Sequence, residues 1–262
     1  MCQFFSFVGD GHGNYLYASW ADRKALLKTK KSEEADSHTS ILTRAKIPPK
    51  NQERWNKYEY NPLTKAFVVD HGVDGHDHEA ARNWAEALDW SAVVPALRIK
   101  PIINSLLIER KGRPSKTEIA RLKKWASVWD SVRDSVWDSV WDSVRDSVGD
   151  SVWDSVWDSV RDSVWDSVWD SVRDSVWDSV RDSVGDSVGD SVLDSVLDSV
   201  GASVWAYISS FFAIKYKFDF SSAITLWEAG LVASFDGKTW RLHSGKSAEI
   251  VYEWTPRRRA TK

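Results

Sequence analysis

Residues 70–79 gather side chains that commonly bind metal ions. The stretch holds three His and three Asp. His76 and His78 would fall on one side of an extended segment, because side chains alternate along a strand. Zinc accepts imidazole nitrogen and carboxylate oxygen as ligands, so His71, His76 and His78 are the candidate metal ligands. The alternative is a flexible Asp- and Gly-rich loop that caps the next helix, since the spacing matches no established zinc motif.

Cys2 is the second candidate for chemistry. If Met1 is removed, the thiol becomes a nucleophile with its own α-amine as base. The opening resembles that of class II glutamine amidotransferases, which begin with Met-Cys and run into a strand. The resemblance implies amidotransferase or hydrolase chemistry, but Ser6 or Phe7 stands where those enzymes carry Gly. The alternative is a small buried thiol at the start of a strand.

Two strand–turn–strand segments are predicted around these residues. Residues 2–8 and 15–20 flank a Gly-rich turn, and because a strand follows it, the turn does not suit phosphate binding. Residues 56–70 form a second strand, turn and strand, with the turn at Asn61-Pro62.

A helix is predicted from Asp77 or His78 through Leu88, with an apolar face toward the core. These elements predict an N-terminal α+β module over residues 1–114. A helical linker over residues 115–124 follows it.

Residues 125–204 repeat one four-residue sequence twenty times. Ser and Val never change, and Asp is replaced only at Ala126 and Ala202. The fourth position holds Trp nine times, Arg five times, Gly four times and Leu twice. Codons for these four residues can differ by one base, so the array resembles recently copied DNA.

A period of four gives no fixed apolar face in an α-helix, because each repeat advances by about 40° around the axis. Asp also stacks on Asp at i,i+4, where like charges repel. We therefore expect a β-solenoid in which Val points inward and Asp-Ser turns each corner. The variable residue then points outward, because a packed interior could not exchange Trp for Gly without a void.

Two alternatives to the solenoid stay open. In the first, the helix predicted at residues 115–124 runs on, and the array forms long helices broken at Gly149 and at Gly185 and Gly189. In the second, the array is a disordered low-complexity chain, although nine Trp and twenty Val are more apolar than such chains usually are.

An outward variable position would display aromatic and basic side chains, which usually marks a contact surface. The candidate binding residues are Trp129, Trp137, Trp141, Trp153, Trp157, Trp165, Trp169, Trp177, Arg133, Arg145, Arg161 and Arg173.

Residues 205–262 predict a C-terminal cap and a small α+β module. Trp205-Ala206-Tyr207-Ile208 keeps the repeat spacing and would close the array as a terminal cap. A helix follows from Ser221 or Ser222 to Ala229, then a hairpin at Asp236-Gly237 and a third strand over residues 248–254. A basic tail ends the chain.

The net charge of −3 hides a strong division. Eighteen Asp against five Arg give the array a charge of −13, and the other 182 residues carry +10. The array should repel phosphates, so a nucleic acid is not the expected partner there.

One cysteine and no apolar run long enough to cross a bilayer predict a soluble cytoplasmic protein.

Several segments together carry a wider resemblance: residues 1–5, 36–41, 56–62, the Asp-Ser-Val array and residues 235–243. They resemble uncharacterised proteins from gut metagenomes and their phages that carry tandem tetrapeptide repeats. The resemblance implies a phage-associated origin, and hence a bacterial host cell, but no activity, cofactor or catalytic residue.

The sequence thus predicts a non-enzymatic structural or interaction protein. It would present a Trp- and Arg-rich repeat surface to a protein, a glycan or a second copy of itself, with no cofactor and no membrane. The alternatives are an enzyme that uses Cys2 or a metal held by the histidines, and a spacer grown by slippage of the repeat.

Overall fold

The computed structural model describes residues 5–27, 37–73, 75–132, 135–148, 150–184 and 190–256. The chain divides into two compact units. The first comprises Met1–Pro101, Val144–Ser163 and Phe211–Ile214, and the second comprises Ile102–Ser143, Val164–Ser210 and Lys215–Lys262. The repeat array contributes residues to both units.

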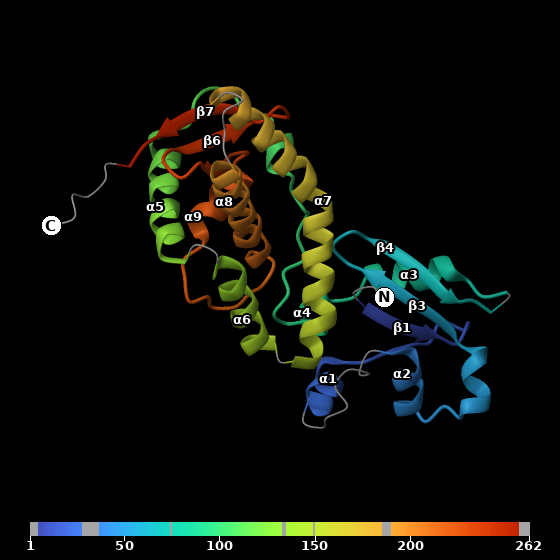
Figure 1. Cartoon of the computed structure of the whole chain (residues 1–262). Coiled ribbons are helices and arrows are strands. Elements are labelled where there is room, and N and C mark those ends of the chain that lie inside the picture. The colour runs from blue at the N-terminus through green and yellow to red at the C-terminus, as the bar shows by residue number, and fades with distance from the viewer. Residues whose placement is uncertain are drawn as a thin grey trace. The chain divides into compact units, whose positions relative to one another are not determined.

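A four-stranded antiparallel sheet organises the first unit (Figure 1). Its strands are β1 (Phe5–Gly9), β2 (Tyr15–Tyr17), β3 (Asn56–Asn61) and β4 (Ala66–His71), in the order β2-β1-β3-β4. Both predicted strand–turn–strand segments are confirmed. Gly11 and Gly13 take φ values of 77° and 88° in the first turn, a region that other residues rarely enter.

Helices cover both faces of this sheet. They are α1 (Trp20–Leu27), α2 (His38–Arg44), η2 (Pro49–Arg54), α3 (His78–Glu86) and α4 (Trp90–Val93). On one face Val8 packs with Ile41 and Leu42 of α2. On the other, the ring of Phe7 lies 5.0 Å from that of Trp84 in α3. The predicted helix after the His-rich loop is confirmed, with the Asp77 side chain accepting a bond from the Ala80 amide at 3.0 Å.

The predicted β-solenoid is wrong, because the described part of the array is helical. It lies in α5 (Lys116–Val132), α6 (Val136–Val148), α7 (Asp150–Val184) and α8 (Asp190–Ser209). α6 ends one residue before Gly149 and α7 one residue before Gly185, next to glycines at which the helical alternative placed its breaks. The division between α5 and α6 has no glycine. The predicted cap at Trp205 is simply the continuation of α8.

Ser and Arg side chains of the array bond to groups of their own helices. Ser hydroxyls donate to the carbonyl four residues earlier, for example from Ser143 to Ser139 at 2.7 Å and from Ser203 to Ser199 at 3.0 Å. The Arg repeats place positive charge beside the Asp ladder through i,i+3 ion pairs, including Arg161–Asp158 at 2.9 Å and Arg181–Asp178 at 3.0 Å. Each such exposed pair is worth only about 0.3–0.5 kcal/mol, so they assist the helices rather than account for them.

Burial of valine provides the main stabilisation of α7. The valines of successive repeats from Val160 to Val180 are all buried. Each fully buried valine contributes about 1.5–3 kcal/mol relative to an exposed one. Since the row turns by about 40° per repeat, it faces a new direction at every step. Tertiary packing therefore determines the helix, and the neighbours of one repeat position differ along it.

The second unit contains a three-stranded antiparallel sheet, β5 (Val232–Phe235), β6 (Trp240–Ser244) and β7 (Glu249–Trp254), in that order. η3 (Ser105–Leu107) and α9 (Ser221–Glu228) are its other short elements. The predicted hairpin, third strand and helix are confirmed. α5, α8 and α9 lie beside this sheet (Figure 1). Trp227 and Trp240 are buried in its core.

Candidate binding site: a tryptophan-lined pocket

The array helices of the second unit enclose a pocket of about 270 Å³. α5, α6, α7 and α8 all contribute lining residues. The lining residues are Trp129, Val136, Trp137, Trp165, Trp169, Leu197, Asp198, Gly201, Ala202 and Trp205. Half of them are tryptophans, so the pocket offers large flat apolar surfaces.

The indole rings contact one another across and along the helices. Trp165 and Trp169 stack at 4.2 Å between centroids, since residues four apart are neighbours on a helix surface. Trp205 of α8 lies 5.0 Å from Trp165 of α7 and 6.3 Å from Trp137 of α6. Trp137 also stacks on Trp141 at 5.9 Å. The period of four thus creates paired rings, and α8 joins the two pairs.

Small residues stand at Gly201 beside the Trp169 ring and at two buried positions of the array. A Cβ added to Gly201 would lie 3.4 Å from the Trp169 ring, in ordinary contact. Ala202 is 4% exposed and Ala126 is 3% exposed. These are the two positions at which Ala replaces the Asp of the repeat. A carboxylate buried there would lose its hydration without a partner, so both exceptions to the repeat coincide with burial.

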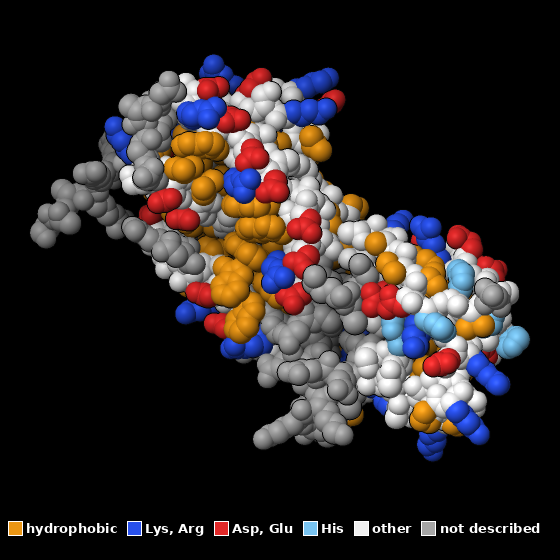
Figure 2. Space-filling model, turned by 45° about the vertical axis from the view of Figure 1, so that its right-hand side comes forward, with side chains coloured by type: hydrophobic (Ala, Val, Ile, Leu, Met, Phe, Trp, Pro, Cys, Tyr) orange, Lys and Arg blue, Asp and Glu red, His pale blue; other side chains and the backbone are white. Residues whose placement is uncertain are grey.

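A cluster of charged side chains lies beside the Trp169 ring. Arg173 bonds Asp174 at 2.9 Å and pairs with Asp170 at 3.3 Å, and the bond to Asp174 raises the pKa of the guanidinium. Its Cζ lies 5.9 Å from the centroid of the Trp169 ring. Such cation–π contacts are worth about 0.5–1 kcal/mol when exposed and about 2 kcal/mol when desolvated. The face drawn in Figure 2 shows hydrophobic side chains gathered beside acidic and basic ones.

The predicted binding tryptophans do not share one environment. Trp137 is 38% exposed, and Trp141, Trp165, Trp169 and Trp177 are half-buried. Trp129 is 6% and Trp157 2% exposed, so the variable position does not point outward there. Within the first unit, the ring centroids of Trp157 and Phe212 lie 6.0 Å apart. The side chain of Trp153 lies outside the described residues.

The predicted arginines are also dispersed. Arg161 and Arg173 are partly exposed and pair with Asp of their own helix, and Arg145 is half-buried. Arg133 lies outside the described residues. The sequence prediction missed six of the residues that line the pocket: Val136, Leu197, Asp198, Gly201, Ala202 and Trp205. Trp205 keeps the repeat spacing, which was the signal that could have included it.

The three predicted metal ligands bond three different groups. His71 Nε2 lies 3.0 Å from the Glu53 carbonyl, and His78 Nδ1 lies 3.0 Å from the Tyr58 hydroxyl. His76 Nδ1 contacts the Asn56 amide. Within the described residues, which omit Asp74, no three His, Cys, Asp or Glu side chains form a group suited to a metal ion. Metal binding by these histidines stays a prediction, and Cys2 lies outside the described residues.

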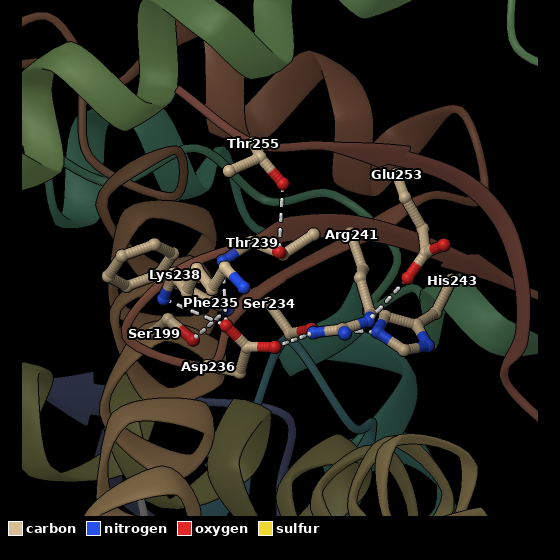
Figure 3. A network of polar contacts seen from close by, with 10 residues as sticks. All are labelled: Ser199, Ser234, Phe235, Asp236, Lys238, Thr239, Arg241, His243, Glu253 and Thr255. Atoms are coloured by element: carbon tan, nitrogen blue, oxygen red, sulfur yellow. Dashed lines mark hydrogen bonds and ion pairs between the residues drawn. The ribbon is translucent and has the colours of Figure 1, made fainter. Parts of the chain in front are cut away.

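A buried polar network in the second unit includes a Ser–His pair (Figure 3). His243 Nδ1 lies 2.9 Å from the Ala248 carbonyl, which only accepts, so Nδ1 donates. Nε2 must then accept from the Ser234 hydroxyl at 2.7 Å. This polarity suits nucleophilic catalysis, but both side chains are fully buried and no substrate reaches them. The pair joins β5 to β6, and burial lowers the pKa of His243 to about 4.

Comparisons with known proteins assign no family to the chain. No protein-family model matches it, and searches of curated proteins and of solved structures find no similar chain. None of the described helices combines the length and apolar character needed to cross a membrane.

Proposed function

We propose that the protein is a non-enzymatic interaction protein whose array helices offer the tryptophan-lined pocket to a partner. One observation carries the proposal: five tryptophans from four helices converge on one accessible pocket. Tryptophan is the residue most enriched among those that dominate binding energy at protein interfaces. Trp129 is buried, but Trp137 is 38% exposed and Trp165, Trp169 and Trp205 are half-buried, whereas rings needed only for the core would be buried as Trp125 is.

The partner in this proposal is a polypeptide. The charge of −13 on the array disfavours a nucleic acid. The stacking of Trp165 on Trp169 covers ring faces that a glycan would otherwise use. The resemblance to phage-associated proteins and the single cysteine support a bacterial cytoplasm as the place of action.

Selection of peptides from a random displayed library on the full chain tests this function. We expect peptides that bind with micromolar dissociation constants and lose at least tenfold in affinity on Trp137→Ala. Trp177→Ala is the matched control, because Trp177 holds the same repeat position on α7 but does not line the pocket. Circular dichroism verifies that both variants keep the helices.

Two results would contradict the proposal. One is the absence of any enriched peptide, and the other is a set of peptides that bind wild type and Trp137→Ala equally well. Sedimentation of the free chain covers the remaining partner: self-association that Trp137→Ala abolishes would identify a second copy of the chain as the ligand.

A further inference from the structure

We infer that the tryptophan-lined pocket takes an aromatic side chain of the partner, which lays the face of its ring against the edge of the Trp169 indole. This inference rests on the proposed function and adds the chemical class of the group that enters. It depends on the volume of the pocket, the polarity of its lining and the geometry of its rings.

The pocket has room for a whole ring. Its volume is about 270 Å³, whereas an apolar cavity of about 150 Å³ in another protein binds benzene. Apart from Asp198, the lining side chains are apolar or indole. Water and polar ligands therefore find few hydrogen-bonding partners there, and an apolar ring is the better occupant.

Both faces of the Trp169 ring are already covered. Trp165 stacks on it with 4.2 Å between centroids, and the Arg173 guanidinium lies over it with its Cζ 5.9 Å from the centroid. These three residues follow one another at four-residue spacing on α7, so Trp165 and Arg173 lie on opposite sides of the ring. A ligand therefore meets Trp169 at the edge of its ring.

The free edge of Trp169 borders the pocket. A Cβ on Gly201 would lie 3.4 Å from Cη2 and 3.5 Å from Cζ3 of Trp169, which belong to the outer edge of the six-membered ring. Gly201 and Trp169 both line the pocket. An edge-to-face contact already occurs within the lining, between Trp137 and Trp205, whose ring planes meet at 74°.

This geometry distinguishes between classes of ligand. The edge of an aromatic ring is its positive part and the face is its negative part. An aromatic ligand can place its face against the Trp169 edge, a favourable contact that an aliphatic side chain of the same size lacks. A cation prefers the face of an indole, which is occupied at Trp169, and the acidic array disfavours an anion.

Two probes of nearly equal shape test the inference on the full chain. Nα-acetyl-phenylalanine methylamide has an aromatic ring, and Nα-acetyl-cyclohexylalanine methylamide has a saturated ring that is more apolar. Binding is followed in NMR spectra of the Trp169 ring protons. We expect the phenylalanine probe to bind at least about threefold more tightly. It should also shift the Hη2 and Hζ3 signals upfield, because protons over a ring face experience its ring current.

Gly201→Ala and Asp194→Ala form a matched pair. Both place alanine on α8 and favour the helix, but of the two positions only Gly201 lines the pocket. The new methyl group would stand in ordinary contact with the Trp169 edge and cover it. Gly201→Ala should therefore keep the fold, as circular dichroism verifies, and weaken the phenylalanine probe at least about fivefold. Asp194→Ala should leave both the fold and the binding unchanged.

Three outcomes would overturn the inference: equal or tighter binding of the cyclohexylalanine probe, no upfield shift of the Trp169 signals with the phenylalanine probe, or equal binding by Gly201→Ala and wild type. The library experiment separates these failures from failure of the function. Peptides that depend on Trp137 but carry no aromatic residue would leave the interaction function standing and overturn the aromatic ligand.

Discussion

Trp165 of α7 and Trp205 of α8 lie with ring centroids 5.0 Å apart and planes tilted by 33°. One belongs to the regular array and the other to the sequence that follows it. Their contact joins the stacked pair Trp165–Trp169 to the pair Trp137–Trp141 through α8. The pocket is therefore a product of tertiary packing between helices, and the array sequence alone does not form it.

Ala202→Asp restores the repeat sequence and should destabilise the second unit. Ala202 is buried, so the new carboxylate would lose its hydration without a partner. We expect a loss of about 2–4 kcal/mol in the free energy of unfolding, measured by urea denaturation. The reverse exchange, Asp194→Ala, lies at an exposed position and should stay within about 0.5 kcal/mol. Equal effects would refute the explanation given for the missing Asp.

Trp157→Ala and Trp177→Ala compare two environments of one repeat position on α7. Trp157 is buried against Phe212, whereas Trp177 is half-buried. We expect Trp157→Ala to cost about 3–5 kcal/mol and Trp177→Ala clearly less. Chemical denaturation of the two variants measures the difference. A solenoid-like array with equivalent positions would give equal losses.

Acid should weaken the fold through His243. Burial lowers the pKa of this imidazole to about 4, below the value of about 6.5 in an unfolded chain. Between these values the unfolded chain binds a proton that the folded chain does not, so the free energy of unfolding falls as pH drops through this window. The expected loss is roughly 3 kcal/mol.

The variant His243→Gln isolates this effect from the carboxylates. At neutral pH it should be less stable than wild type, because the bonds to Ser234 and Ala248 change. The deficit should shrink as pH approaches 4. A deficit that stays constant between pH 7 and 4 would show that His243 does not titrate as described.

Asp236→Asn should remove a charge that the buried Arg241 needs. The Arg241 side chain is 5% exposed and pairs with Asp236, which is 10% exposed, and with the more exposed Glu253. Asn keeps an acceptor for the turn amides of Lys238 and Thr239. We expect a loss of about 3–5 kcal/mol. Glu253→Gln should cost less than about 1 kcal/mol, and thermal unfolding of both variants tests the contrast.

The terminal elements were predictable because their signals are local. Asn61-Pro62 and Asp236-Gly237 start tight turns between short strands, and Asp77 caps α3 through its own side chain. Each depends on a few adjacent residues. The hairpins and the helix therefore follow from sequence, although the sheet order and the sharing of the array between two units do not.

The prediction of a solenoid is wrong because a repeated sequence does not require a repeated environment. Successive repeats share one environment in a solenoid, where they stack in register. In a helix each repeat turns by about 40°, so on α7 Trp157 is buried against Phe212 while Trp177 is half-buried. The same reasoning explains why the pocket was found only in part: Trp165 and Trp169 were predicted as exposed anchors, but their partner Trp205 was assigned to a cap.

The row of valines that turns around α7 also limits which changes in the number of repeats the fold tolerates. Insertion or loss of one repeat in a helix moves everything beyond it by about 6 Å along the axis and about 40° around it. The buried valines from Val164 to Val180 would then face different neighbours, and Trp165 would lose its contact with Trp205. A change in the number of repeats within α7 would therefore destabilise the fold, even when every inserted or lost residue matches the repeat.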